Sequence, residues 1–274
     1  NFFYLQPRYY CLLMINQGEF IKAAEKAFAI ADFSHKLTHR IIATAAKRLI
    51  DYGFSYAEFR NKYGKDFKFD NTKRAAKHLS YVEFQMEKIV SDLLGDTTKI
   101  SKTTAKDNLG KIPDDDWDKA AFIASLMYGD TYKQRVKKYT QEFKNEIESF
   151  VKVGQEEKMT ADGILHWYME KLEDPKSDEL IISAIASGIV KMEGLSAYRS
   201  FRNLNDDMIV RGFAKANSHY WKFAEAKFII AQKDSHTCDT CSNLDGQVFP
   251  INEDVIPVHG SCRCVEIPIM NVAY

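Results

Sequence analysis

The first 230 residues carry apolar positions three and four residues apart, separated by charged ones, which is the spacing of amphipathic helices. Residues 19–32, for example, place Phe20, Ala24 and Phe28 on one stripe. The same spacing predicts further helices over 34–53, 55–64, 71–94 and 130–153, the last being the longest, and glycines follow several of them as expected helix ends. The sequence therefore predicts a mainly α body of roughly eight to ten helices.

Residues 96–113 interrupt this pattern. Lysines lie among threonines and serines with no sustained period, and Pro113 follows, so we expect a mobile basic linker or hairpin and a possible subdivision of the body. Residues 114–116 are all aspartate, and we expect them in the first turn of the next helix rather than in a metal cluster, because carboxylates there complement the helix dipole. The acidic pairs at 178–179 and 206–207 are interpreted as helix starts for the same reason.

The character of the sequence changes near residues 228–234. Three of the six prolines follow, together with short β-type runs at 247–249 and 265–267. We expect a helical body over residues 1–230 and a small C-terminal α+β or β-hairpin module over residues 231–274.

Four of the five cysteines lie in this module, in two short motifs. Cys238-x-x-Cys241 allows two thiolates to reach one ion, and His259-x-x-Cys262-x-Cys264 brings a second set of ligands after a short excursion. Asp245-Gly246 predicts the hairpin turn that would bring the motifs together. A tetrahedral zinc ion would take four of these five residues, and a filled coordination sphere leaves no position for a reactive water.

Other interpretations of the module remain open: reduced thiols packed in a small core, or two disulfides. His236 is expected to cap a turn or face solvent. Cys11 lies alone in an apolar run, which disfavours a Cys/His nucleophile. The chain has no phosphate-binding glycine motif and no H-E-x-x-H motif, so we expect neither a catalytic site nor a small-molecule substrate.

Charge and hydropathy limit the classes of partner that we expect this chain to bind. Lys plus Arg and Asp plus Glu are 38 each, so no overall charge attracts DNA or an anionic membrane. The aromatic and basic residues of 198–223 and the lysines of 99–111 could contact nucleic acid, although a core helix with basic flanks is favoured. No apolar run is long enough to span a bilayer, so we expect an intracellular, soluble product with no membrane partner. Because the sequence begins at Asn1, we expect a fragment of a longer chain.

The module also resembles a known family. Its signature consists of Asp234, Cys238-x-x-Cys241, Leu244-Asp-Gly246, Phe249 and Pro257-x-His259-x-x-Cys262-Arg-Cys264. These residues, over about 40 positions, resemble the C-terminal signature of the phage Mu protein F-like family. His236 stands where that family usually has Arg, and Gly260 where it usually has Pro. Neither departure removes a candidate ligand, but Gly260 leaves the turn before Cys262 less restrained.

The resemblance implies a minor head, or head morphogenesis, protein of a tailed phage or prophage. We expect a structural role in head assembly and in the fate of the DNA, with a portal or capsid protein as partner and a structural Zn²⁺. Such a protein would lie in the virion, in the head interior or at the portal vertex, and in the host cytoplasm during assembly. The alternatives are a zinc-containing DNA-binding protein and a toxin or effector fused to a Mu F-like module.

Overall fold

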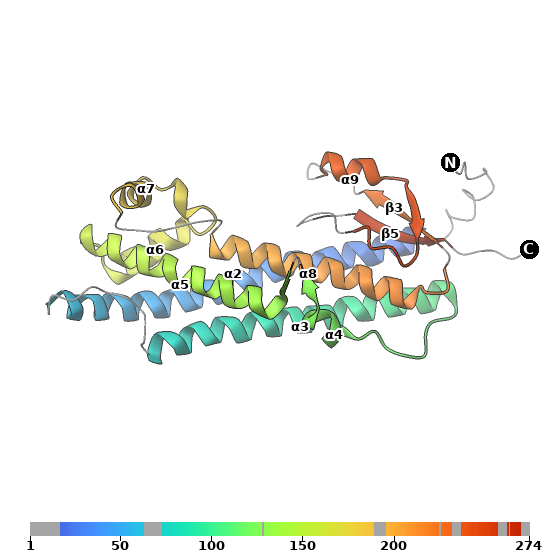
Figure 1. Ribbon diagram of the computed structural model, residues 1–274, viewed down its shortest axis with the longest axis horizontal. Helices are drawn as coiled ribbons and strands as arrows, with labels where there is room; N and C mark the ends of the chain where they lie inside the picture. Colours follow the sequence, from blue (N-terminus) through green and yellow to red (C-terminus); the bar gives the residue numbers. More distant parts are fainter. Residues whose placement is uncertain are drawn as a thin grey trace, which may run out of the picture. The chain divides into compact units, whose positions relative to one another are not determined.

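The computed structural model describes residues 17–62, 73–127, 129–188, 196–224, 226–231, 237–256, 262 and 264–269. The chain is mainly helical, with a small antiparallel sheet near its C-terminal end (Figure 1), which confirms the predicted fold class. Within those ranges, none of the helices combines the length and hydropathy that a membrane span requires.

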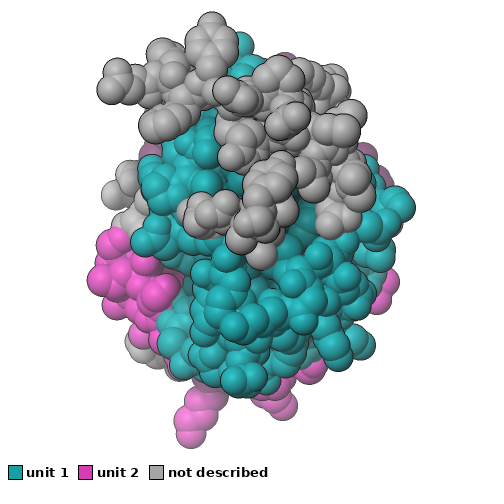
Figure 2. All heavy atoms as spheres, turned by 90° about the vertical axis from the view of Figure 1, so that its right-hand side faces the viewer, with its two compact units in different colours: residues 1–34, 90–123, 204–274 teal, residues 35–89, 124–203 magenta. Residues whose placement is uncertain are grey.

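The chain divides into two compact units, each assembled from segments that are far apart in the sequence (Figure 2). Unit 1 consists of residues 1–34, 90–123 and 204–274, and unit 2 of residues 35–89 and 124–203. Three long helices contribute residues to both units: α2 (Gln17–Lys62), α3 (Lys73–Leu109) and α8 (Ala197–Tyr220).

Unit 2 adds a series of shorter helices. Their bounds are α5 (Tyr132–Glu156), α6 (Ala161–Glu170), η1 (Pro175–Ser177) and α7 (Glu179–Ala186), preceded by the two-residue strands β1 (Leu126–Met127) and β2 (Asp130–Thr131). Thr131 closes a capping box at the start of α5, and Thr160 caps α6. Asp178 caps α7, where its side chain accepts hydrogen bonds from the Leu180 and Ile181 N–H groups. The acidic pair at 178–179 is therefore a helix start, as expected.

Unit 1 contains α4 (Lys119–Ala124), except for its last residue, and the C-terminal sheet. The rings of Phe20 and Trp221 meet edge to face with centroids 5.1 Å apart in its helical core. The sheet has the order β4-β3-β5, with β3 (Ala226–Ala231) between β4 (Val248–Pro250) and β5 (Cys264–Ile269), and both pairings are antiparallel. The sheet thus begins at Ala226, and the expected boundary after residue 230 falls inside its first strand.

The helices continue past the glycines that were expected to end them. Gly53 lies inside α2, Gly95 inside α3 and Gly154 inside α5, each without the left-handed conformation of a helix stop. The glycines lower helix propensity by only about 1 kcal/mol each, which the burial of the flanking apolar stripe outweighs.

The predicted linker at 96–113 is wrong as far as Leu109, because α3 continues to that residue. Thr97, Ser101 and Ala105 are all fully buried and follow one another at four-residue spacing, so this segment has an inward helical face made of small residues. The Thr97 hydroxyl donates to the Leu94 carbonyl, and that of Ser101 donates to Asn217 at 2.5 Å.

Two predicted helix starts are also wrong. Asp206 and Asp207 lie in the interior of α8 and are buried, where Asp206 accepts a hydrogen bond from Ser34 and Asp207 one from Arg211. Residues 114–116 precede α4, and it is Asp118 that accepts a hydrogen bond from the Ala121 N–H in its first turn. Acidic pairs occur at helix starts and in buried networks alike, so the sequence pattern did not separate them.

Candidate metal centre

Two elements of unit 1 bring the cysteines together. The short helix α9 (Asp239–Leu244) begins directly after Cys238, and Cys241 lies one turn further on. Cys264 opens β5 and pairs with Ala231 at the end of β3. α9 and the sheet lie side by side (Figure 1), because an apolar cluster including Ile229 and Ile256 fills the space between them.

Cys241, Cys262 and Cys264 form a compact group of buried thiols. Their Sγ atoms all lie within 4.8 Å of one another, and each residue is at most 3% exposed. The Sγ atoms of Cys241 and Cys262 are 3.8 Å apart, which is too long for a disulfide bond. Two thiolates bound to one tetrahedral zinc at about 2.3 Å would be separated by about 3.8 Å. Among the described residues, the cluster therefore has the size of a metal site.

Without a bound cation, the electrostatics of the group favour neutral thiols. Burial raises the pKa of the Cys241 thiol to about 12, and the adjacent Cys262 and Cys238 sulfur atoms add to that rise. The hydrogen bond with Cys262 and then burial raise the pKa of Cys264 far above its usual range. Three thiolates cannot be charged together in this environment unless positive charge lies between them, and a divalent ion supplies that charge.

Cys238 lies at the edge of the group. It is partly exposed and occupies the N-cap position of α9, where its Sγ accepts a hydrogen bond from the Cys241 N–H at 3.4 Å. The structure therefore brings three of the five predicted ligands together and places a fourth beside them. His259, the fifth, lies outside the described residues, as do His236 and Cys11.

The predicted hairpin between the two motifs is wrong. Cys238 and Cys241 flank the start of a helix, and β4 and β5 both pair with β3 rather than with each other. Gly246 does make a turn, with φ 77°, and its N–H donates to the Ile229 carbonyl at 2.8 Å. The predicted strands at 247–249 and 265–267 correspond to β4 and β5.

The aromatic residues of 198–223 are mostly core and the basic ones are exposed or half-buried, as favoured from the sequence. Tyr198, Phe201, Tyr220 and Trp221 are all buried, whereas Phe223 is exposed. The Nζ atom of Lys111 lies 4.5 Å from the Phe223 ring centroid. Phe223 is therefore an accessible aromatic ring with a cation beside it.

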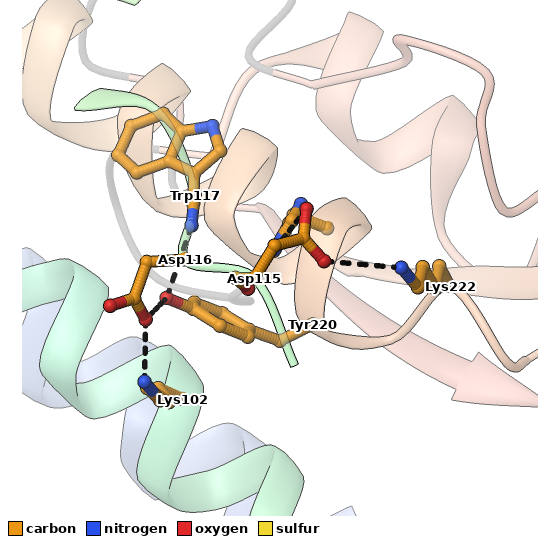
Figure 3. Close-up of polar contacts among 7 residues, drawn as sticks. Lys102, Asp115, Asp116, Trp117, Tyr220 and Lys222 are labelled. Atoms are coloured by element: carbon orange, nitrogen blue, oxygen red, sulfur yellow. Dashed lines mark hydrogen bonds and ion pairs between the residues drawn. The ribbon is translucent and has the colours of Figure 1, made fainter. Parts of the chain in front are cut away.

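The loop before α4 neutralises nearby lysines (Figure 3). Asp116 pairs with Lys102 at 2.5 Å and accepts a hydrogen bond from the Tyr220 hydroxyl, while Asp115 pairs with Lys222 at 3.4 Å. The hydrogen bond from Lys102 lowers the pKa of Asp116. A hydrogen bond from the Asp115 backbone, and then the charge of Lys222, lower the pKa of Asp115. Two of the lysines that could contact phosphates are thus engaged by carboxylates.

Comparisons with protein-family models, with curated proteins and with solved structures return no match for this chain.

Proposed function

We propose that this chain is a structural minor head protein of a tailed phage or prophage, similar to the phage Mu protein F-like family. One observation carries the proposal: the family-like motifs Cys238-x-x-Cys241 and Cys262-Arg-Cys264 supply the three thiols that meet in one buried group. Cysteines that matched the spacing of the family signature by chance would have no reason to converge in space.

The metal in this proposal is Zn²⁺. An all-sulfur or sulfur-rich set suits zinc, and a closed tetrahedral site stabilises the fold without activating water. The small sheet has three strands, of which β4 has three residues, so a metal tie between α9 and β5 would add stability that its own core supplies poorly. The role is therefore structural and not enzymatic.

The helical body would contact the portal or capsid protein. Its helices expose mixed charges, and ion pairs such as those of Lys102 with Asp116 and Arg202 with Glu173 give it a surface without a single sign of charge. Such a surface suits specific protein docking in a head interior or at a portal vertex better than non-specific adhesion to DNA.

Two measurements test the proposal. Purified particles from an induced prophage or phage that encodes the chain should contain it in a few copies, by quantitative mass spectrometry. The purified chain should carry one zinc ion per molecule by elemental analysis, and chelation should lower its thermal stability. Absence from the particles refutes the head function, and absence of zinc refutes the metal tie.

A second candidate, a DNA-binding protein, is favoured by a single feature: the exposed Phe223 ring beside Lys111 and Lys222, which could stack on a base. A mobility-shift titration at several salt concentrations separates the two functions. Affinity that falls steeply as salt rises would favour DNA binding, and Phe223→Ala should then weaken it. No shift at micromolar protein would favour docking to protein.

A further inference from the structure

Cys238 has an unusual position for a cysteine. It is the N-cap of α9, a position that Ser, Thr, Asp and Asn normally occupy because their oxygen atoms accept a hydrogen bond from the first turn. Here the Cys238 sulfur is the acceptor, bonded by the Cys241 N–H at 3.4 Å. This hydrogen bond holds the Cys238 sulfur over the first turn of α9, beside Cys241.

Cys238 also lies beside the group of three buried thiols. It packs on the apolar cluster that contains Cys241, Cys262 and Cys264, and its sulfur interacts with the Cys241 thiol. Cys238 is not part of the helix itself, with φ −85° and ψ 166°, but as its N-cap it lies one turn before Cys241. The three sulfur atoms that lie within 4.8 Å of one another do not include the Cys238 sulfur. The Cys238 side chain must therefore turn inward to join them.

We infer that Cys238 is the fourth ligand, so that the metal is held by four thiolates. The inference rests on the metal site of the proposed function and specifies its chemistry. Four thiolates are a soft ligand set that selects Zn²⁺ over hard cations such as Mg²⁺ or Ca²⁺. They also leave a net charge of −2 on the complex, which backbone donors such as the Cys241 N–H help to stabilise.

The competing ligand is His259, whose imidazole would give a site of three sulfurs and one nitrogen with a net charge of −1. The full chain distinguishes the two sites when Co²⁺ replaces Zn²⁺, because the sulfur-to-cobalt charge-transfer absorption scales with the number of thiolates. Cys238→Ser is the informative variant, since serine is a preferred N-cap and keeps α9 capped while it removes the sulfur. Cys238→Asn is a second variant with the same property.

We expect both Cys238 variants to bind Zn²⁺ at least about tenfold more weakly, in competition with a chromophoric chelator, than the original chain. Their charge-transfer absorption should fall in proportion to the loss of one thiolate in four. His259→Gln should change neither quantity, and Cys11→Ser, which removes a thiol outside the motifs, serves as the matched control. Circular dichroism of each metal-loaded variant checks that the helices persist.

Two other results are informative. In the first, His259→Gln weakens Zn²⁺ binding while the Cys238 variants bind Zn²⁺ as tightly as the original chain. That result refutes the four-thiolate site but leaves the metal site in place. If the original chain binds neither Zn²⁺ nor Co²⁺, the metal part of the proposed function fails, and this inference fails with it.

Discussion

The Nζ atom of Lys227 lies 2.7 Å from Oε1 of Glu266, and the two side chains are only 1% and 2% exposed. Lys227 is on β3 and Glu266 on β5, and the register of the two strands places both on the face of the sheet that carries Cys264. Burial raises the pKa of Glu266 to about 7 although Lys227 lowers it. Its second oxygen, Oε2, is buried with no hydrogen-bond partner among the described residues.

Removing one member of this pair should be costly. Lys227→Met leaves Glu266 buried without its cation and without its hydrogen-bond donor, so we expect the free energy of unfolding to fall by about 3–5 kcal/mol. Urea titration of the metal-loaded protein, followed by circular dichroism, measures the loss. The double variant Lys227→Met with Glu266→Met removes both charges and should be close to the original chain or more stable. A single variant as stable as the double one would contradict the coupling.

Gly212 is a close-packing position in α8. A Cβ atom there would lie 2.1 Å from Leu94 Cδ2 and 3.3 Å from Phe122 Cε1. Leu94 is fully buried and cannot swing aside, so the clash should exceed the roughly 1 kcal/mol that alanine gains in helix propensity. We expect Gly212→Ala to lower the free energy of unfolding by about 1–3 kcal/mol in chemical denaturation.

Gly95 provides the matched control, because it also lies inside a helix but its Cβ would meet only Lys119 Nζ at 3.5 Å. Gly95→Ala should therefore raise the free energy of unfolding by up to about 1 kcal/mol. Leu94→Ala combined with Gly212→Ala should destabilise by less than the sum of the single changes, since the clash is gone. Additive effects would show that Leu94 is not the obstacle.

The fold class could be predicted because large apolar residues mark the helices and proline and β-branched residues mark the terminal strands. Helix ends could not, since Gly53 and Gly95 are tolerated where tertiary packing supports the helix. The inward face of α3 after residue 96 was missed because threonine, serine and alanine form it, as at Thr97 and Ser101, and these carry little hydropathy signal.

The candidate site was predictable to the extent that its ligands are close in sequence. The spacing of Cys238 and Cys241, and of Cys262 and Cys264, identified the thiols, but not the helix that begins between the first two. The Lys227–Glu266 pair joins residues 39 positions apart and had no signal, because the sequence of either strand alone does not reveal its partner.

Glu146 links α5 to the start of α8. Its Oε1 accepts a hydrogen bond from the Ala197 N–H at 2.6 Å, and its Oε2 accepts one from the Tyr168 hydroxyl at 3.5 Å. A carboxylate at a helix N-terminus accepts a hydrogen bond from a backbone N–H that has no partner within the helix, and its negative charge complements the helix dipole. Glu146→Ala should remove both effects, lowering the free energy of unfolding by about 1–3 kcal/mol in denaturant titration.

Tyr168→Phe separates the two hydrogen bonds of Glu146. It removes only the longer one and keeps the ring packing on Phe150, so we expect a loss of at most about 1 kcal/mol. If Tyr168→Phe proved as damaging as Glu146→Ala, the cap on Ala197 would not be the stabilising contact.

His78 on α3 should make unit 2 less stable in acid. Burial, and then the charges of Arg48, Arg74 and Lys77, lower the pKa of its imidazole from the ordinary 6.5. The unfolded chain therefore binds a proton near pH 6.5 that the folded chain rejects, so stability is full above that pH and falls as the pH drops through it, until the lowered folded pKa is reached.

The side chain is only partly buried, so solvent screens the repulsion and the effect is modest. His78→Gln removes the titrating group, and its free energy of unfolding should fall less between about pH 7 and pH 5 than that of the original chain, by thermal unfolding at each pH. Added salt should narrow the difference between the two chains, because it screens the neighbouring arginine and lysine charges. Parallel pH profiles at low salt would show that His78 keeps its ordinary protonation in the folded state.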